Sequence, residues 1–275
     1  MALVRFQGVS LSFGEREALA GLDLEIRERE VFGLLGPNGA GKTTALRVLC
    51  GLLEPSAGTV TVAGHDTRAE PLLVRRELSY VPDGAPLYAN LSPLQHLALV
   101  GRLHGMEEDR IASESLRLLS ALDLADRARD PVGSFSRGMR QKTALACAIL
   151  PRPKLLVLDE PLNGLDAPTT AVFKEVLRSW AERGGAVLYT SHLLDVAERV
   201  CDRVAVLDRG RLVGAGTLEE LRTLAGRDGT LEQVFGALTR GQDPREQAER
   251  LLGPSVARAA SGSASGGTGR PPRPS

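Results

Sequence analysis

One glycine-rich segment of this sequence has the residue types and the spacing of a phosphate-binding loop. It reads Gly-Pro-Asn-Gly-Ala-Gly-Lys-Thr over residues 36–43 and fits G-x-x-x-x-G-K-[ST]. The glycines let consecutive backbone N–H groups turn toward phosphate oxygens, and a following helix presents its positive dipole end to the same anion. Lys42 would reach the β- and γ-phosphates, and the Thr43 hydroxyl would bind Mg²⁺. The residues expected to contact a nucleotide are Gly36, Pro37, Asn38, Gly39, Ala40, Gly41, Lys42, Thr43 and Thr44.

Two adjacent carboxylates follow a second apolar segment. Residues 155–158 are all aliphatic and precede Asp159 and Glu160. Ligands bind at the carboxyl ends of strands in an open parallel sheet, so we expect both acids to lie beside the phosphate-binding loop. There Asp159 would bind Mg²⁺, and Glu160 would polarise a water molecule for in-line attack on a γ-phosphate. Taken alone, the two acids could simply end a strand. Together with the loop they predict a nucleoside triphosphatase.

The elements that must position these residues follow from the hydrophobic pattern. Continuous apolar runs at 31–35, 155–158 and 186–190 are typical of buried strands. Apolar-periodic helices at 42–52 and 168–183 indicate a largely parallel sheet covered on both faces. A strand before the glycine-rich loop and a helix after it disfavour a simple turn without a nucleotide. The other strands expected are 3–7, 22–27, 58–63, 78–81, 203–207 and 211–215, and the other helices of this α/β part are 193–200, 218–224 and 231–238.

A helical block interrupts the α/β pattern. Residues 93–104, 110–122 and 137–150 are helical in period, with few strand signals between them. We therefore expect an α/β fold in which a P-loop NTPase core, with a mixed, largely parallel sheet and an antiparallel β subdomain, carries an inserted helical subdomain. The expected divisions are 1–82 and 152–240 for the core, 83–151 for the helical subdomain, 241–252 for a C-terminal helix and 253–275 for a tail whose composition predicts disorder.

The composition narrows the classes of function. Among 275 residues, Lys and Arg number 34 and Asp and Glu number 34, so bulk charge does not favour polyanion binding. Three well-separated cysteines without a CxxC pair, and four histidines without metal-ligand spacing, disfavour a disulfide framework or a structural zinc site. No apolar run approaches the ~18 residues that cross a bilayer, and the first residues alternate like a strand rather than a signal peptide. We expect a cytosolic chain that reaches a membrane only through a partner.

A further motif decides which kind of nucleoside triphosphatase this is. Residues 134–142, Ser-Phe-Ser-Arg-Gly-Met-Arg-Gln-Lys, open a helix before the acidic strand. They resemble the signature of the ATP-binding-cassette (ABC) ATPases, which usually reads Leu-Ser-Gly-Gly-Gln. Ser136 and Gly138 keep the hydroxyl and the bare backbone of an anion site at a helix N-terminus, whereas Arg137 and Met139 depart in a way that recurs in exporter-type members. The resemblance implies that this site closes on the γ-phosphate of a second subunit. Taken alone, Ser-x-Gly before a helix is an ordinary cap.

Other residues follow the family pattern in order. Phe13 stands where the family stacks an aromatic ring on adenine, although an aromatic side chain at a strand end also packs on a core. Residues 163–166 match a loop that crosses the dimer interface, and His192 matches the switch histidine that contacts the γ-phosphate. Asp83 stands where the family usually has Gln, whose amide reaches Mg²⁺. A carboxylate suits Mg²⁺, so Asp83 is a candidate ligand, with a simple loop acid as the alternative.

The resemblance covers roughly residues 2–240 and implies a function. The chain would be the ATP-binding and ATP-hydrolysing subunit of an ABC transporter, with ATP and Mg²⁺ as cofactors, on the cytoplasmic, inner face of the cell membrane. A separate transmembrane permease would dock near Tyr88 and residues 91–104, and a homodimer, or a heterodimer with a similar ATPase, would sandwich the ATP. Residues 231–239 resemble the final helix of exporters, and the regulatory β-domain of many importers is absent, which favours export.

Two other functions compete with this one. A soluble ABC-type ATPase switch would act on nucleic acid or on a protein partner. Such members usually carry two cassettes in tandem, whereas this sequence has one phosphate loop and one signature, so we expect no nucleic-acid partner. A nucleotide-binding module without turnover is disfavoured because Glu160 and His192 are both present. The transported molecule is not encoded here, since its binding site would lie in the permease.

Overall fold

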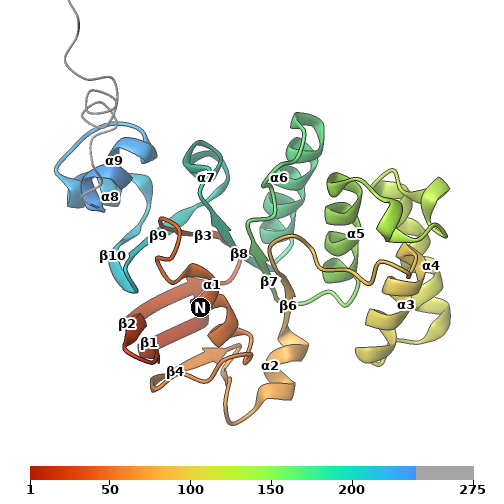
Figure 1. The fold of residues 1–275 in the computed structure, drawn as a ribbon, viewed down its shortest axis with the longest axis horizontal. Coiled ribbons are helices and arrows are strands. Elements are labelled where there is room, and N and C mark those ends of the chain that lie inside the picture. Colours follow the sequence, from red (N-terminus) through yellow and green to blue (C-terminus); the bar gives the residue numbers. More distant parts are fainter. Residues whose placement is uncertain (240–275) are drawn as a thin grey trace, which may run out of the picture. The chain divides into compact units, whose positions relative to one another are not determined.

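A six-stranded sheet forms the centre of the computed structural model, which describes residues 1–239. The strand order is β10-β9-β3-β8-β7-β6 (Figure 1). All neighbouring strands are parallel except β9 and β10, which are antiparallel. The strands of this sheet are β3 (Val31–Leu35), β6 (Leu78–Val81), β7 (Leu155–Asp159), β8 (Ala186–Ser191), β9 (Arg203–Asp208) and β10 (Arg211–Gly216). Strands β3, β7 and β8 are buried along their whole length, which explains their continuous apolar sequences.

A second, antiparallel sheet has the order β2-β1-β4-β5. Its strands are β1 (Ala2–Phe13), β2 (Arg16–Arg27), β4 (Ala57–Val62) and β5 (His65–Asp66). Strand β1 runs well past the expected end at residue 7, because the pairing continues beyond an irregularity at Gly8, whose φ is 58°. The alternation of buried and exposed residues breaks at that glycine, so the sequence pattern alone stops there.

Two apolar cores lie on the two faces of the six-stranded sheet. Because side chains alternate along β3, Phe32 and Leu34 pack with the antiparallel sheet and α1, whereas Val31 and Leu35 pack with helices on the other face. Figure 1 shows α6 and α7 on that second face. The helices of this part are α1 (Lys42–Leu49), α2 (Pro71–Glu77), α6 (Ala167–Glu182), α7 (Leu194–Val200), α8 (Leu218–Ala225) and α9 (Leu231–Leu238).

A third core belongs to the helical block. It joins α3 (Pro93–Leu103), α4 (Glu108–Ala121) and α5 (Arg137–Ile149) through buried residues that include Leu97, Leu119 and Ala146. Helix α5 also contributes Ala144 and Leu145 to the core on the helical face of the sheet, so it connects the block to the α/β part. The expected subdomain boundaries at 83 and 151 stay a prediction, and the described residues 1–239 belong to one compact unit.

The predicted α/β architecture with an antiparallel sheet and an inserted helical block agrees with these elements. Helix α2 and the two-residue strand β5 were not expected, and α1 ends at Leu49 rather than at residue 52 because Gly51 adopts φ 64°. The expected helix at 241–252 and the tail at 253–275 lie outside the described residues. Within residues 1–239, no helix combines the length and the apolar character that crossing a membrane requires.

Candidate functional site

The glycine-rich loop connects β3 to α1 and passes very close to neighbouring backbone. A Cβ atom at Gly36 would lie 2.5 Å from the carbonyl oxygen of Leu207, and one at Gly41 would lie 2.6 Å from that of Ala18. Gly41 also has φ 108°, a conformation that other residues rarely adopt. Both positions therefore require glycine. The loop keeps a bare backbone beside the N-terminus of α1, as a phosphate cradle does.

Lys42 begins α1, and its buried ammonium folds back over the loop. The Nζ atom donates hydrogen bonds to the carbonyl oxygens of Gly36 at 2.6 Å and Pro37 at 3.3 Å, and it lies 3.9 Å from Oε1 of Glu160. Burial lowers the pKa of Lys42, while the carboxylates of Glu160 and Asp159 act in the opposite direction. A buried cation held by carbonyls and a carboxylate is ready to receive phosphate oxygens in their place.

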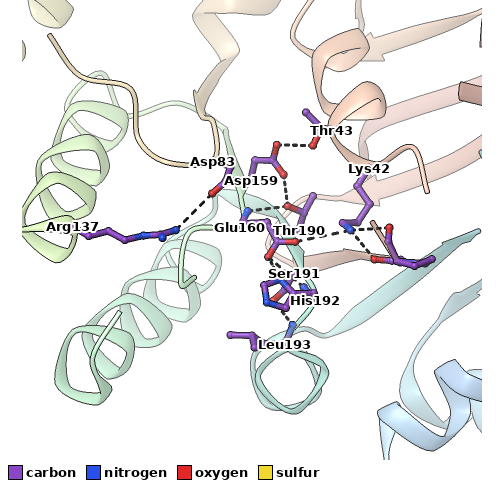
Figure 2. Close-up of polar contacts among 12 residues, drawn as sticks. Lys42, Thr43, Asp83, Arg137, Asp159, Glu160, Thr190, Ser191, His192 and Leu193 are labelled. Atoms are coloured by element: carbon purple, nitrogen blue, oxygen red, sulfur yellow. Dashed lines mark hydrogen bonds and ion pairs between the residues drawn. The ribbon is translucent and has the colours of Figure 1, made fainter. Parts of the chain in front are cut away.

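Asp159 ends β7 and is almost fully buried, with both carboxylate oxygens engaged (Figure 2). Thr43 Oγ1 donates to Oδ2 at 3.0 Å, and Thr190 Oγ1 donates to Oδ1 at 2.6 Å. Thr190 also accepts the backbone N–H of Glu160 at 2.9 Å. The hydroxyl of Thr43 beside a carboxylate supplies the hard oxygen donors that Mg²⁺ prefers, so the residues present fit that ion.

Glu160 lies between the lysine of the loop and a histidine. Its Oε2 atom is 2.8 Å from Nδ1 of His192 and accepts the backbone N–H of the same residue at 3.3 Å. Glu160 has φ 49°, which is uncommon outside glycine, and such strained backbone clusters at functional sites. The carboxylate is therefore held in a defined position beside Lys42, where it could act on a water molecule.

A pocket of about 390 Å³ brings most of the predicted residues together. Phe13 stands at its edge with a 53% exposed side chain that is free to stack on a ring. His192 is joined to the pocket through Glu160. The lining residues are Phe13, Arg16, Ala18, Asn38, Gly39, Ala40, Gly41, Lys42, Thr43, Thr44, Asp83, Asp159 and Glu160.

Ser136 and Gly138 do not line this pocket. Ser136 is the N-cap of α5, and its Oγ accepts the backbone N–H of Met139 at 3.2 Å. The cap geometry is the ordinary one, and it leaves the start of α5 as a separate anion-binding candidate. Ser136 and Gly138 therefore lie apart from the pocket that collects the other predicted residues of the site.

Two polar residues of the site, Arg16 and Thr190, were not predicted from the sequence, and neither was the lining residue Ala18. Arg16 faces Phe13 across the β1–β2 hairpin, and a Cβ at Gly39 would lie 3.2 Å from its guanidinium. Thr190, which orients Asp159, is paired with it in neighbouring strands. A short hairpin after Phe13 would have placed Arg16 opposite Phe13 and so beside the nucleotide. Thr190 could be found only by knowing that β7 and β8 are adjacent.

Among the other histidines and cysteines, His96, Cys50 and Cys147 are buried packing residues, whereas His104 is exposed. Buried His96 accepts the backbone N–H of Tyr88 at its Nε2 atom, 3.0 Å away. Burial raises the pKa of Cys50 and of Cys147 to about 12, so neither is a thiolate nucleophile at neutral pH.

Comparison with known proteins adds independent findings. The family model "ABC transporter" matches residues 19–163. The daunorubicin resistance ATP-binding protein DrrA3 of Streptomyces coeruleorubidus is 40% identical over 225 residues, which cover 82% of this chain and 71% of that protein. The Nod factor export ATP-binding protein I of Rhizobium sp. (strain N33) is 39% identical over 210 residues, which cover 76% of this chain and 69% of that protein.

Two solved structures share the fold. One, described as an ATP binding subunit of an ABC transporter, has a TM-score of 0.82 and 31% identity, covering 86% of this chain and 99% of its own. The other, a nucleotide-free ATP-binding cassette from an ABC transporter, has a TM-score of 0.73 and 22% identity over the same shares of both chains, and it supports the fold alone. The predicted fold class is confirmed.

Proposed function

This chain belongs to the ABC transporter family, and we propose that it binds and hydrolyses ATP to power export through a separate transmembrane permease. One observation carries the catalytic part of the proposal. Residues 116 or more positions apart converge, with Thr43 Oγ1 3.0 Å from Asp159 Oδ2 and Lys42 Nζ 3.9 Å from Glu160 Oε1. A cation, a hydroxyl and two carboxylates at a glycine cradle are the groups that phosphoryl transfer to water needs.

Each residue has a proposed part in hydrolysis. Lys42 and residues 36–44 hold the phosphates, and Phe13 stacks on the adenine. Glu160 takes a proton from the attacking water, and His192 holds the Glu160 carboxylate and contacts the γ-phosphate. Thr43, Asp159 and Asp83 are the proposed Mg²⁺ ligands. When bound, Mg²⁺ neutralises charge that develops on the phosphate oxygens.

A second subunit would complete the site. Ser136 and Gly138 stand at an anion-binding helix start but outside the pocket of their own chain, which supports a sandwich of two subunits around ATP. The test is gel filtration of a Glu160→Gln variant, in which hydrolysis is blocked. Saturating Mg-ATP should convert it from monomer to dimer, and a protein that stays monomeric would contradict the sandwich.

The permease would dock on a groove between the sheet and the helical block. A cavity of about 340 Å³ lies there, lined by residues of β6, α3 and α5 that include Tyr80, Val100 and Ala144. Tyr88 and Leu103 expose most of their side chains, which is typical of an interaction surface. Export as the direction is supported by the relatives, whose names specify drug resistance or Nod factor export.

Purification from native membranes separates this function from its rival. A tagged chain should be recovered in the membrane fraction and should elute, after detergent extraction, with a partner that has several membrane spans. An ABC-type ATPase switch would instead elute with nucleic acid or with a protein partner that has no membrane spans. Recovery of that second kind would overturn the transport proposal and leave the ATP site intact.

A further inference from the structure

The first residue of α5 contacts two loops from other parts of the chain. Arg137 extends toward the loop after β6, where its Nη2 atom lies 3.9 Å from Oδ1 of Asp83 (Figure 2). The same guanidinium covers Gly164, at which a Cβ would lie 3.2 to 3.4 Å from Nη1, Cζ and Nε of Arg137. The signature helix, the Asp83 loop and the Gly164 loop therefore meet at one arginine.

The stability of α5 does not explain this arginine. A cation in the first turn of a helix opposes the macrodipole and therefore lowers the stability of the helix. The first turn of α5 has no acidic residue to offset that cost. Asp83 supplies the missing negative charge from outside the helix. The two side chains are 47% and 56% exposed, so the pair is weak enough to exchange partners.

Asp83 also lies at the nucleotide pocket, on the other side from Arg137 (Figure 2). It lines the same pocket as Lys42, Thr43, Asp159 and Glu160, where a bare carboxylate would add negative charge beside the phosphates. Pairing with Arg137 neutralises that charge and holds Asp83 toward α5. Arg137 and Asp83 are 54 positions apart in the chain, and the structure brings their charged groups together.

We propose that Arg137 is a positioning residue, which holds Asp83 at the edge of the nucleotide pocket and thereby ties the start of α5 to the state of that pocket. The proposal rests on the proposed function for the identity of the ligand. The contact itself belongs to the chain without nucleotide and can be tested there.

Backbone amide hydrogen exchange of the full-length chain without nucleotide tests the contact. Arg137→Gln should speed exchange in residues 83–86, and Asp83→Asn should speed exchange at residues 137–140, each by about 1.5- to 5-fold, the range for an exposed ion pair. The double variant should exchange no faster than the faster single variant at either segment. The proposal would be overturned if the accelerations of exchange in the two single variants multiplied in the double variant. It would also be overturned if the Arg137→Gln protein exchanged at the parental rate in residues 83–86.

Two further variants separate charge from general destabilisation. Arg137→Lys keeps the charge and should restore parental exchange at 83–86, whereas a Lys variant that behaves like Gln would contradict a charge contact. Arg117→Gln is the matched control, because Arg117 lies on α4 with a 57% exposed side chain paired to Glu114 at 2.8 Å. It should leave both segments unchanged, and equal acceleration by this control would overturn the proposal.

A kinetic measurement shows whether the contact serves turnover. Arg137→Gln should lower the kcat of ATP hydrolysis and leave the KM for Mg-ATP within about twofold. Asp83→Asn also removes a proposed Mg²⁺ ligand and should lower kcat at least as much, and the double variant should fall no further than Asp83→Asn alone. Losses of kcat that multiply in the double variant would contradict a shared role. If the parent itself hydrolyses no ATP, the proposed function fails, and the exchange experiment still decides whether the contact exists.

Discussion

Thr190 and Asp159 are paired across β8 and β7, and the threonine hydroxyl donates to Oδ1 of the aspartate at 2.6 Å. The same hydroxyl accepts the backbone N–H of Glu160 at 2.9 Å. One buried side chain therefore orients both acids of the site. This leaves Oδ2 of Asp159 facing Thr43. The orientation of two proposed Mg²⁺ ligands, Thr43 and Asp159, therefore depends on Thr190, which is not itself a proposed ligand.

Thr190→Val keeps the shape of this side chain and removes the hydroxyl. Loss of a buried hydrogen bond to a carboxylate should lower the free energy of unfolding by about 1.5–3 kcal/mol and raise the Mg²⁺ concentration needed for half-maximal ATPase activity. Thr190→Ser keeps the hydroxyl and is the control. Urea unfolding and a magnesium titration check both effects, and identical magnesium midpoints for Val and Ser would refute the orienting role.

Lys42→Ala should weaken ATP binding by about 10- to 150-fold, the factor that corresponds to the ~1.5–3 kcal/mol of a charge-assisted contact. Calorimetric titration with ATP measures this directly. Lys174→Ala, on α6 and outside the pocket lining, should bind ATP like the parent. Unchanged affinity in the Lys42 variant would remove the assignment of the phosphate loop.

Phe13→Ala should weaken ATP binding by about 2- to 10-fold, because a stacked aromatic pair contributes roughly 0.5–1.5 kcal/mol. Phe13→Tyr keeps the ring and should retain affinity. Inorganic tripolyphosphate has no base, so the parent and the Phe13→Ala variant should bind it with the same affinity. Equal losses for ATP and tripolyphosphate would mean that Phe13 acts on the phosphate loop rather than on adenine.

His192→Ala should reduce kcat by on the order of 10- to 100-fold with little change in ATP affinity, since the Glu160 carboxylate loses the group that holds it at 2.8 Å. Single-turnover hydrolysis at saturating enzyme separates this chemical step from binding. A variant that keeps parental single-turnover rates would place His192 outside the reaction.

The part of the site that could be predicted from the sequence consists of residues in local motifs. The residues from Gly36 to Thr44 and the acids Asp159 and Glu160 follow buried strands directly, and the geometry of a parallel sheet places strand ends together. The contacts of Thr190 and Arg137 could not be predicted in this way, because they depend on residues that are distant in the sequence. They join residues that are 31 and 54 positions from their partners, and neither is marked by a local pattern, so only the packed chain reveals them.

The elements that the sequence did not indicate are short or weakly patterned. Helix α2 has seven residues and buries only Val74, which is too little for a helical period to be visible. Strand β5 consists of two residues paired to the end of β4. Both depend on neighbours already in place, whereas β3, β7 and β8 have apolar runs long enough to stand out alone.

The rate of ATP hydrolysis by the purified parent and its Glu160→Gln variant tests the central claim most directly, with ATP binding measured in parallel. An amide cannot accept the proton of the attacking water, so the variant should hydrolyse ATP at least about 100-fold more slowly while binding ATP as tightly as the parent. A variant that hydrolyses ATP at the parental rate, or a parent without ATPase activity, would contradict the account.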